Sequence, residues 1–283
     1  MRSLRAITIL SVFLLVTLIL LPWQKSALWF GLKRRKSFPQ NYHRFMAKLF
    51  GLRVRVIGEP VQDGGVLIVA NHTSYFDIVV FSITQRVSFV AKSQVRDWPF
   101  FSTLASLQET VYVERERRSK TGEARDEIRD RLRAGDTLVL FPEGTSNDGN
   151  RVLPFKSALM GAAETMLGND ASGNPVPVAV QPVSVAYVGL YGIPMGRENR
   201  PMFAWYGDME LVPHLWEALK MGPIDVVIEY HPPMTAQGAG GRKALAAAAE
   251  AIVREGQARA LAGAFAPRKV ADKDEIVIVE EAA

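Results

Sequence analysis

An uncharged and almost wholly apolar stretch, Ala6 to Leu21, dominates the first part of the hydrophobic pattern. Its 16 residues fall slightly short of the ~20 that a helix needs to cross a bilayer core. Arg2 and Arg5 precede the stretch, and Trp23 and Lys25 follow it. We therefore expect an N-terminal membrane-anchoring helix, which either spans the membrane tightly or lies in one leaflet. A cleaved signal peptide is a weaker interpretation, because no small-x-small cleavage site precedes Lys25.

A basic amphipathic helix is predicted next. His43, Arg44 and Lys48 lie on one side of it, and apolar residues recur at helical spacing on the other. The apolar set is Tyr42, Phe45, Met46, Leu49 and Phe50. Such a helix either lies in the headgroup layer of a membrane or packs on the core of the domain.

Short apolar runs alternate with helical segments along the rest of the chain, and this alternation is typical of an α/β fold. The expected strands cover residues 52–57, 66–70, 87–91, 110–113, 137–141, 176–187, 202–208 and 225–230. The expected helices cover residues 78–83, a segment from Asp97 onward, 116–134, 158–167, 213–220 and 244–262. The charged segment after Pro267 is expected to be mobile.

The positive charge of the chain is confined to its first part. The whole chain has a net charge of +5, yet residues 1–58 contain 11 Lys and Arg and no acidic residue. Removing these 11 from the 34 basic residues leaves 23 against 29 acidic residues, a net charge of −6 for the remainder. Basic residues that flank an apolar segment favour a membrane surface, and an acidic globular part argues against nucleic-acid binding.

The orientation in the membrane follows from the basic run Lys33-Arg34-Arg35-Lys36. This run outweighs Arg2 and Arg5, so the positive-inside rule puts the rest of the chain in the cytoplasm if the apolar segment spans. We expect a bacterial inner-membrane location with the catalytic domain on the cytoplasmic side. The sequence contains no cysteine, which excludes a disulfide framework and a thiolate metal site and fits a cytosolic domain.

Candidate chemistry first appears where the apolar run 66–70 breaks into a polar turn. His72 is expected in this turn, and Asp77 in the first turn of the helix that follows. A separation of five would place the two residues about 140° apart within one helix, so contact requires that His72 precede it. An Asp bound to one imidazole nitrogen makes the other a better base. The alternative is that Asp77, with Ser74, only caps its own helix.

A second apolar strand runs into the turn Phe141-Pro142-Glu143-Gly144-Thr145, about seventy residues later. The pattern Asn71-His72-x4-Asp77 followed by Phe-Pro-Glu-Gly-Thr resembles the motifs of the glycerolipid acyltransferases. This family includes the 1-acylglycerol-3-phosphate acyltransferases, and the resemblance covers about residues 50 to 235. Together with the strand and helix pattern, it implies an α/β fold with a single acyltransferase domain. We expect a central, mostly parallel mixed sheet flanked by helices, plus the N-terminal membrane-anchoring helix.

The resulting division has three parts. Residues 1–50 form the membrane anchor and the basic amphipathic helix, residues 51–265 form the acyltransferase domain, and residues 266–283 form a mobile tail.

The resemblance also implies roles for individual residues. His72 and Asp77 are the expected catalytic residues, and Arg115 is expected to hold the phosphate of the acceptor, with Arg117 or Arg118 as alternatives. Glu143 is expected in acceptor binding. The expected substrate-binding set is Arg115, Glu143, Gly144, Thr145 and Lys156.

The expected reaction moves a fatty acyl group from a thioester to the free hydroxyl of a lysolipid. The donor is acyl-CoA or an acyl carrier protein, and we expect no metal and no bound cofactor. His72 removes the hydroxyl proton without an acyl-enzyme, since no Gly-x-Ser-x-Gly elbow and no cysteine exist. Backbone amides at the start of the helix after His72, or one near Pro182, are the candidates for the oxyanion site.

The acceptor is left open between two lysolipids. The first choice by resemblance is 1-acyl-sn-glycerol-3-phosphate, which would give phosphatidic acid for phospholipid synthesis. Two departures from the family pattern bear on this choice, because Gln108-Glu109 and Ser157 stand where glycines are common. The rival acceptor is lyso-ornithine lipid, which has no phosphate. A non-catalytic membrane-binding protein is the alternative from another class, and the sequence does not indicate an oligomeric state.

Overall fold

The computed structural model describes residues 1–62, 64–114, 118–265 and 277–280. Its main sheet has nine strands among these residues, in the order β11-β1-β10-β8-β2-β5-β3-β4, with β9 paired to β8. The pairs β8–β10 and β8–β9 are antiparallel and the other pairs are parallel. The sheet is therefore mixed and mostly parallel, as predicted.

The strands of this sheet are β1 (Leu52–Ile57), β2 (Val66–Ala70), β3 (Ser88–Lys92), β4 (Val111–Val113), β5 (Thr137–Leu140), β8 (Ala179–Leu190), β9 (Ile193–Pro194), β10 (Ile224–Tyr230) and β11 (Val277–Glu280). A separate hairpin contains β6 (Met166–Asn169) and β7 (Pro175–Pro177). The helices are α1 (Arg2–Trp29), α2 (Phe38–Phe50), α3 (Phe76–Thr84), α4 (Phe101–Leu107), α5 (Arg118–Arg133), α6 (Leu211–Lys220), α7 (Ala236–Ala239) and α8 (Arg242–Leu261).

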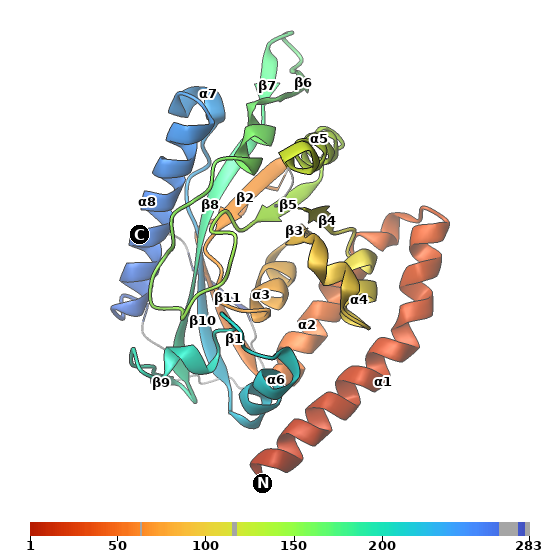
Figure 1. The fold of residues 1–283 in the computed structure, drawn as a ribbon, viewed down its shortest axis with the longest axis vertical. Coiled ribbons are helices and arrows are strands. Elements are labelled where there is room, and N and C mark those ends of the chain that lie inside the picture. The colour runs from red at the N-terminus through yellow and green to blue at the C-terminus, as the bar shows by residue number, and fades with distance from the viewer. Residues whose placement is uncertain (63, 115–117, 266–276, 281–283) are drawn as a thin grey trace.

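The sheet is covered on both faces, which explains why β2 is buried along its whole length. Val66, Ile68 and Ala70 share a core with residues of α1, α2, α3 and α6. Leu67 and Val69 point to the other face and share a core with residues of α5, α7 and α8. Figure 1 shows α8 on one side of the sheet and α2 and α3 on the other. A continuous apolar run with alternating orientation is the expected pattern for a central parallel strand.

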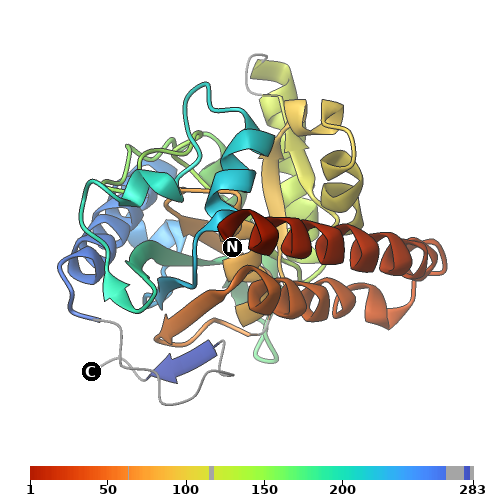
Figure 2. The ribbon, with the colours of Figure 1, turned by 90° about the horizontal axis from the view of Figure 1, so that it is seen from below.

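The N-terminal helix α1 lies along the domain. It packs against α2 and α6, and Figure 2 shows α1 and α2 side by side. The Arg5 guanidinium donates to the carbonyl oxygens of Leu219 and Phe50, and the Thr17 hydroxyl bonds the Tyr42 hydroxyl at 2.7 Å. By length and composition α1 can cross a membrane. Its outward residues include exposed Leu4, Ile7, Leu14, Leu15, Leu18, Ile19 and Trp23.

Two predicted elements are wrong. Residues 202–208 do not form a strand; a 3₁₀ turn at Arg200–Met202 leads into an irregular segment. Its residues make tertiary contacts instead, since Phe203 is fully buried, the Trp205 ring contacts that of Tyr75, and the Trp205 backbone N–H donates to the Thr73 carbonyl oxygen at 3.0 Å. Residues 158–167 form a 3₁₀ turn, Leu159–Glu164, followed by β6, instead of a small-residue helix.

The last segment of the chain is described in part. Val277–Glu280 form β11, which pairs with β1 in parallel. The remaining residues of the expected mobile tail, 266–276 and 281–283, lie outside the described residues.

At Gly256, substitution by alanine is expected to destabilise the protein, although alanine has the higher helix propensity. It lies within α8, and a Cβ there would lie 2.7 Å from His231 Nε2 and closer still to the Ser184 hydroxyl. Gly256→Ala is therefore expected to lower the free energy of unfolding by about 1–3 kcal/mol through overpacking. Gly122 in α5 has no heavy atom within 4 Å of the same position, so Gly122→Ala should instead raise stability by about 1 kcal/mol. Urea titrations of both variants test this contrast; equal effects would contradict it.

Candidate active site

His72 lies in the turn between β2 and α3, next to the carboxylate expected to orient it. Its Nδ1–H donates to Asp77 Oδ2 at 2.8 Å. The same oxygen accepts the backbone N–H groups of Thr73 at 2.8 Å and Ser74 at 3.0 Å. The two sequence interpretations are therefore compatible, because one Asp77 oxygen both ties the turn before α3 and binds His72. Asp77 is fully buried, whereas the His72 side chain is 23% exposed.

Two further residues, Tyr187 and Asn71, hold this turn through contacts that the sequence does not indicate. The Tyr187 hydroxyl on β8 donates to Asp77 Oδ1 at 2.7 Å. The Asn71 side-chain amide donates to the Val185 carbonyl oxygen and its own carbonyl accepts the Val185 N–H, both at 2.8 Å. The turn after β2 is therefore attached to β8 at two points. Asn71 could have been recognised from the sequence, because it stands directly before His72. Tyr187 could not, because it lies 110 positions from Asp77 in the chain.

The turn after β5 lies directly against His72. The Phe141 ring stacks on the imidazole, with centroids 4.2 Å apart and planes 17° from parallel. Glu143 Oε1 accepts the His72 backbone N–H at 3.0 Å. Glu143 Oε2 accepts from Asn147 Nδ2 at 2.8 Å and from the Leu153 N–H at 3.2 Å. The two motifs of the sequence therefore form one site, because Glu143 ties the second turn to the first.

Burial dominates the electrostatics of Glu143. Its residue is 2% exposed, and desolvation raises the pKa of its carboxyl group to about 7, even though three N–H donors favour the charged form. The nearby Asp77 carboxylate raises this pKa further. The carboxylate oxygens of Glu143 thus accept three N–H groups of the protein itself, and the expected role of Glu143 in acceptor binding stays a prediction.

A test of Glu143 follows from its three donors. In Glu143→Gln the amide nitrogen must face one of the N–H groups that the carboxylate accepts, so one donor loses its acceptor. We expect the acyl-transfer rate at pH 8 to fall roughly tenfold, since hydrogen bonds to charged groups are among the stronger ones. Steady-state rates of both forms measure this; an unchanged rate would contradict a positioning role for Glu143.

The stability of the two forms should also differ in pH dependence. Because the pKa of Glu143 is raised from 4.5 to about 7, the folded state binds the proton more tightly than the unfolded state. The stability contributed by this group is complete below pH 4.5 and is lost as pH rises to about 7, by up to about 3 kcal/mol. Glu143→Gln should lack this slope in unfolding titrations, which serves as an internal control for the pKa.

The other predicted substrate-binding residues have different positions. Gly144 adopts a positive φ of 78°, and both Gly144 and Thr145 line the cavity described below. Lys156 is exposed and is absent from the cavity lining, while its backbone N–H donates to the Pro142 carbonyl oxygen at 2.9 Å. Arg115 lies outside the described residues.

The departure at Gln108-Glu109 has a structural counterpart. Glu109 adopts a φ of 54°, the left-handed conformation that a glycine accepts without strain. Gln108 is buried, and its Nε2 donates to Ser82 Oγ at 2.8 Å and to the Val87 carbonyl oxygen at 3.3 Å. The chain thus keeps the turn before β4 without the glycine.

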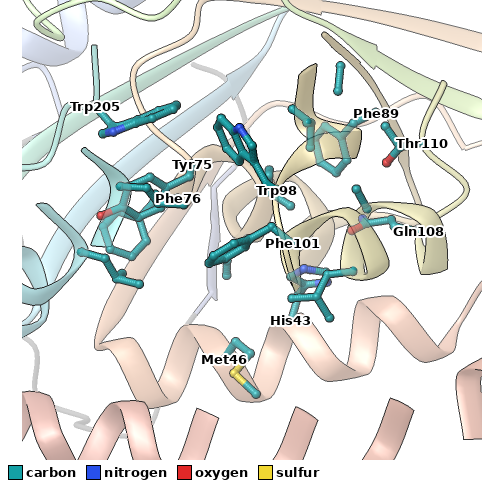
Figure 3. A pocket seen from close by; sticks show the side chains of 18 of the residues that line it. His43, Met46, Tyr75, Phe76, Phe89, Trp98, Phe101, Gln108, Thr110 and Trp205 are labelled. Carbon is teal, nitrogen blue, oxygen red and sulfur yellow. The ribbon is translucent and has the colours of Figure 1, made fainter. Parts of the chain in front are cut away.

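A deep apolar cavity of about 420 Å³ opens beside His72. Figure 3 shows aromatic side chains around it, with Trp205, Tyr75 and Trp98 toward one side and His43 and Met46 toward α2. Trp98 and Trp205 meet edge to face, with centroids 5.6 Å apart. Further lining residues come from α1, α4 and the turn after β5, including Leu10, Phe13, Leu20, Leu104, Leu107, Gly144, Thr145 and Ser146. An apolar cavity of this size fits an extended hydrocarbon chain.

Backbone donors near His72 are mostly occupied. The N–H groups of His72, Thr73 and Ser74 donate to Glu143 or Asp77, so these three amides of the turn before α3 are occupied. The Gly144 N–H donates to the Phe141 carbonyl oxygen. The N–H groups of Thr145 and Ser146 make no hydrogen bond to another described residue, and both residues line the cavity. Among the described residues there is also no group of three His, Cys, Asp or Glu that could hold a metal ion.

Comparisons with known proteins identify the family of this chain. The acyltransferase family model matches residues 53–186. A lyso-ornithine lipid O-acyltransferase of Brucella abortus (strain 2308) is 46% identical over 265 residues, which are 94% of this chain and 98% of that protein. A 1-acyl-sn-glycerol-3-phosphate acyltransferase of Neisseria gonorrhoeae is 28% identical over 176 residues, 62% of this chain and 63% of that protein.

The fold has a counterpart among solved structures. The 1-acyl-sn-glycerophosphate (LPA) acyltransferase PlsC from Thermotoga maritima matches with a TM-score of 0.62, covering 92% of this chain and 97% of that chain at 24% identity. This match concerns the architecture. The sequence likeness to the Brucella protein extends over nearly the full length of both chains, and on that ground the chain belongs to the acyltransferase family and is an acyltransferase enzyme, as its two motifs predict.

Proposed function

We propose that this enzyme transfers a fatty acyl group from a thioester donor to the free hydroxyl of lyso-ornithine lipid. The observation that carries this acceptor is the 46% identity to the Brucella lyso-ornithine lipid O-acyltransferase over almost the whole of both chains. The protein from Neisseria with the glycerol phosphate acceptor is only 28% identical over a shorter segment. Lyso-ornithine lipid therefore replaces 1-acyl-sn-glycerol-3-phosphate, the first choice from the sequence, as the favoured acceptor.

The proposed chemistry uses His72 as a general base. Asp77 holds Nδ1–H, so Nε2 is the nitrogen that takes the proton from the acceptor hydroxyl. The oxygen attacks the thioester carbonyl and forms a tetrahedral intermediate. When the C–S bond breaks, the imidazolium gives its proton to the departing thiolate. The products are an ester and a free thiol, and His72 returns to its neutral form.

The surroundings of His72 support the other steps. The Thr145 and Ser146 amides are the proposed oxyanion donors, because they line the cavity and have no described hydrogen-bond partner. The apolar cavity is the proposed site of an acyl chain. Glu143 is proposed to position the His72 backbone. A role for Lys156 in binding the acceptor remains a prediction, as does one for Arg115.

Membrane association fits both substrates and fold. The acceptor is amphiphilic, and α1 presents an exposed apolar surface while its inner side packs on α2 and α6. We propose that this surface holds the enzyme at the membrane, with the catalytic domain on the cytoplasmic side. Acyl-CoA and an acyl carrier protein both fit the proposed chemistry as donors.

A competition between acceptors tests the proposal. Membranes that contain the enzyme receive lyso-ornithine lipid and lysophosphatidic acid together, with either acyl-CoA or acyl carrier protein as the labelled donor. We expect most of the label in ornithine lipid. Label mainly in phosphatidic acid would favour lysophosphatidic acid, the first choice from the sequence, as the acceptor. Label in neither product would contradict both acceptors.

A further inference from the structure

Among the described residues, Tyr187 is the one side chain bonded to Asp77 that comes from outside the turn and helix around His72. It lies on β8, where Val183, Val185 and Tyr187 share the sheet face that α3 covers. Its residue is 3% exposed and Asp77 is fully buried. The 2.7 Å bond therefore joins two groups that water does not reach.

The four hydrogen bonds of Asp77 are divided unequally between its oxygens. Three N–H groups, all from residues 72–74, meet at Oδ2. Oδ1 receives the Tyr187 hydroxyl. Without that hydroxyl, one oxygen of a buried carboxylate would have no described donor, which is costly in a low-dielectric site.

The phenol remains a donor under all working conditions. Burial and the adjacent Asp77 carboxylate raise the pKa of Tyr187 well above its ordinary value, so the hydroxyl keeps its proton. A donor to a carboxylate stabilises the charged form and lowers its proton affinity. The bond also fixes the plane of the carboxylate, and hence the direction from which Oδ2 meets the imidazole.

We propose that Tyr187 is a positioning residue of the acyl-transfer reaction, which holds Asp77 charged and oriented so that His72 works as the base. This inference rests on the proposed role of His72 and Asp77. Asn71 supports it, because its two bonds to Val185 fix β8 two residues before Tyr187. The strand that supplies Tyr187 is thereby aligned by the residue that precedes His72.

Removal of the Tyr187 hydroxyl is expected to move the pH dependence of the reaction in a defined direction. Loss of the Tyr187 hydroxyl raises the proton affinity of the His72–Asp77 pair as a whole, since the negative charge has one donor fewer. The base then binds its proton at higher pH. Among the described residues, Glu143 and Tyr187 interact with Asp77, Tyr75 interacts with Tyr187, and Lys92 from the end of β3 lines the same cavity as His72.

Tyr187→Phe tests the inference, with Tyr230→Phe as its matched control. Tyr230 lies on the neighbouring strand β10, is 4% exposed, and bonds Thr84 Oγ1 at 2.6 Å with no contact to Asp77. For Tyr187→Phe we expect kcat to fall roughly tenfold, KM for the acceptor to stay within about twofold, and the acid limb of the pH–rate profile to move up by about half a pH unit. Tyr230→Phe should lose similar stability but keep the wild-type kcat and profile. Glu143 titrates in the same range, but it is present in all three forms.

Two outcomes overturn the inference. The first is a Tyr187→Phe enzyme with wild-type kcat and pH profile. The second is equal changes in Tyr187→Phe and Tyr230→Phe, which would mean that only packing is affected. If Tyr187→Phe does not fold, 3-fluorotyrosine at position 187 keeps the contact with a more acidic hydroxyl, and the acid limb should move to lower pH; no movement would also overturn it. His72→Ala is measured in parallel, because wild-type activity in that variant would contradict the role of His72 on which this inference rests, whereas absence of ornithine lipid product from the wild-type enzyme would contradict the proposed function.

Discussion

Replacing His72 by alanine is expected to lower the rate of acyl transfer by about a hundredfold to ten-thousandfold. This is the range that a positioned general base contributes. The variant removes the imidazole that bonds Asp77 at 2.8 Å and stacks on Phe141, but leaves the Glu143 bond to the backbone N–H of residue 72. The fold and the membrane association should therefore persist, since the proposed membrane contact is the exposed outer side of α1 and does not include this turn. Sedimentation of the membranes measures the membrane association of the variant, and initial rates on the sedimented membranes measure its acyl transfer.

His231→Gln is the matched control for that variant. His231 is buried, lies under α8 and bonds the Ser184 hydroxyl at 3.1 Å, on the sheet face opposite to α3. Its replacement should reduce stability and leave the rate per folded enzyme near the wild-type value. A His72→Ala enzyme that retains more than about a tenth of the wild-type rate would exclude His72 as the general base.

Asp77→Asn is expected to lower the rate about a hundredfold or more with little change in fold. An asparagine can keep its carbonyl oxygen toward the three N–H donors at residues 72–74 and turn its amide toward the Tyr187 hydroxyl, which can accept. The turn before α3 is then preserved. The neutral amide cannot stabilise the imidazolium that forms when His72 takes the proton, so the chemical step suffers.

This substitution separates the two interpretations of Asp77. If Asp77 served only to tie the turn, asparagine would replace it well, because Asn and Asp are similar caps, and the rate would stay unchanged. The control is Asp225→Asn, which alters a buried carboxylate that accepts the Gly192 N–H at 3.0 Å and lies 3.8 Å from Arg53. That variant should keep the wild-type rate. Rates and thermal unfolding of both variants are compared at pH 8.

The two turns that carry the site, after β2 and after β5, could be predicted from local sequence. The apolar run 66–70 had to end at a polar turn, and a separation of five residues allowed contact between His72 and Asp77 only across that turn. The same reasoning located the turn after β5. Both strands are parallel neighbours in the sheet, paired from Val66–Thr137 to Val69–Leu140. Their carboxyl ends therefore bring the two motifs to one edge.

The remaining parts depend on contacts that no local pattern reveals. Tyr187 reads in the sequence as one aromatic residue of a buried strand, and its bond to Asp77 depends on β8 lying next to β2. The three N–H donors of Glu143 also depend on tertiary structure, because one of them is the His72 backbone N–H of the other motif. The segment 202–208 resembled a strand because it is aromatic, but its residues pack against the turn after His72 instead of pairing.

The most direct test determines which group of the lipid is acylated and whether the reaction depends on His72. Membranes with wild-type enzyme or the His72→Ala variant receive lyso-ornithine lipid and a labelled acyl thioester, and the ornithine lipid product is then treated with mild alkali. The account predicts product only with wild-type enzyme, and release of all its label by alkali, because the new bond is an ester to the hydroxyl. Alkali-stable label would mean transfer to an amine, and equal product from the His72→Ala variant would mean that another group is the base; either result would contradict the account.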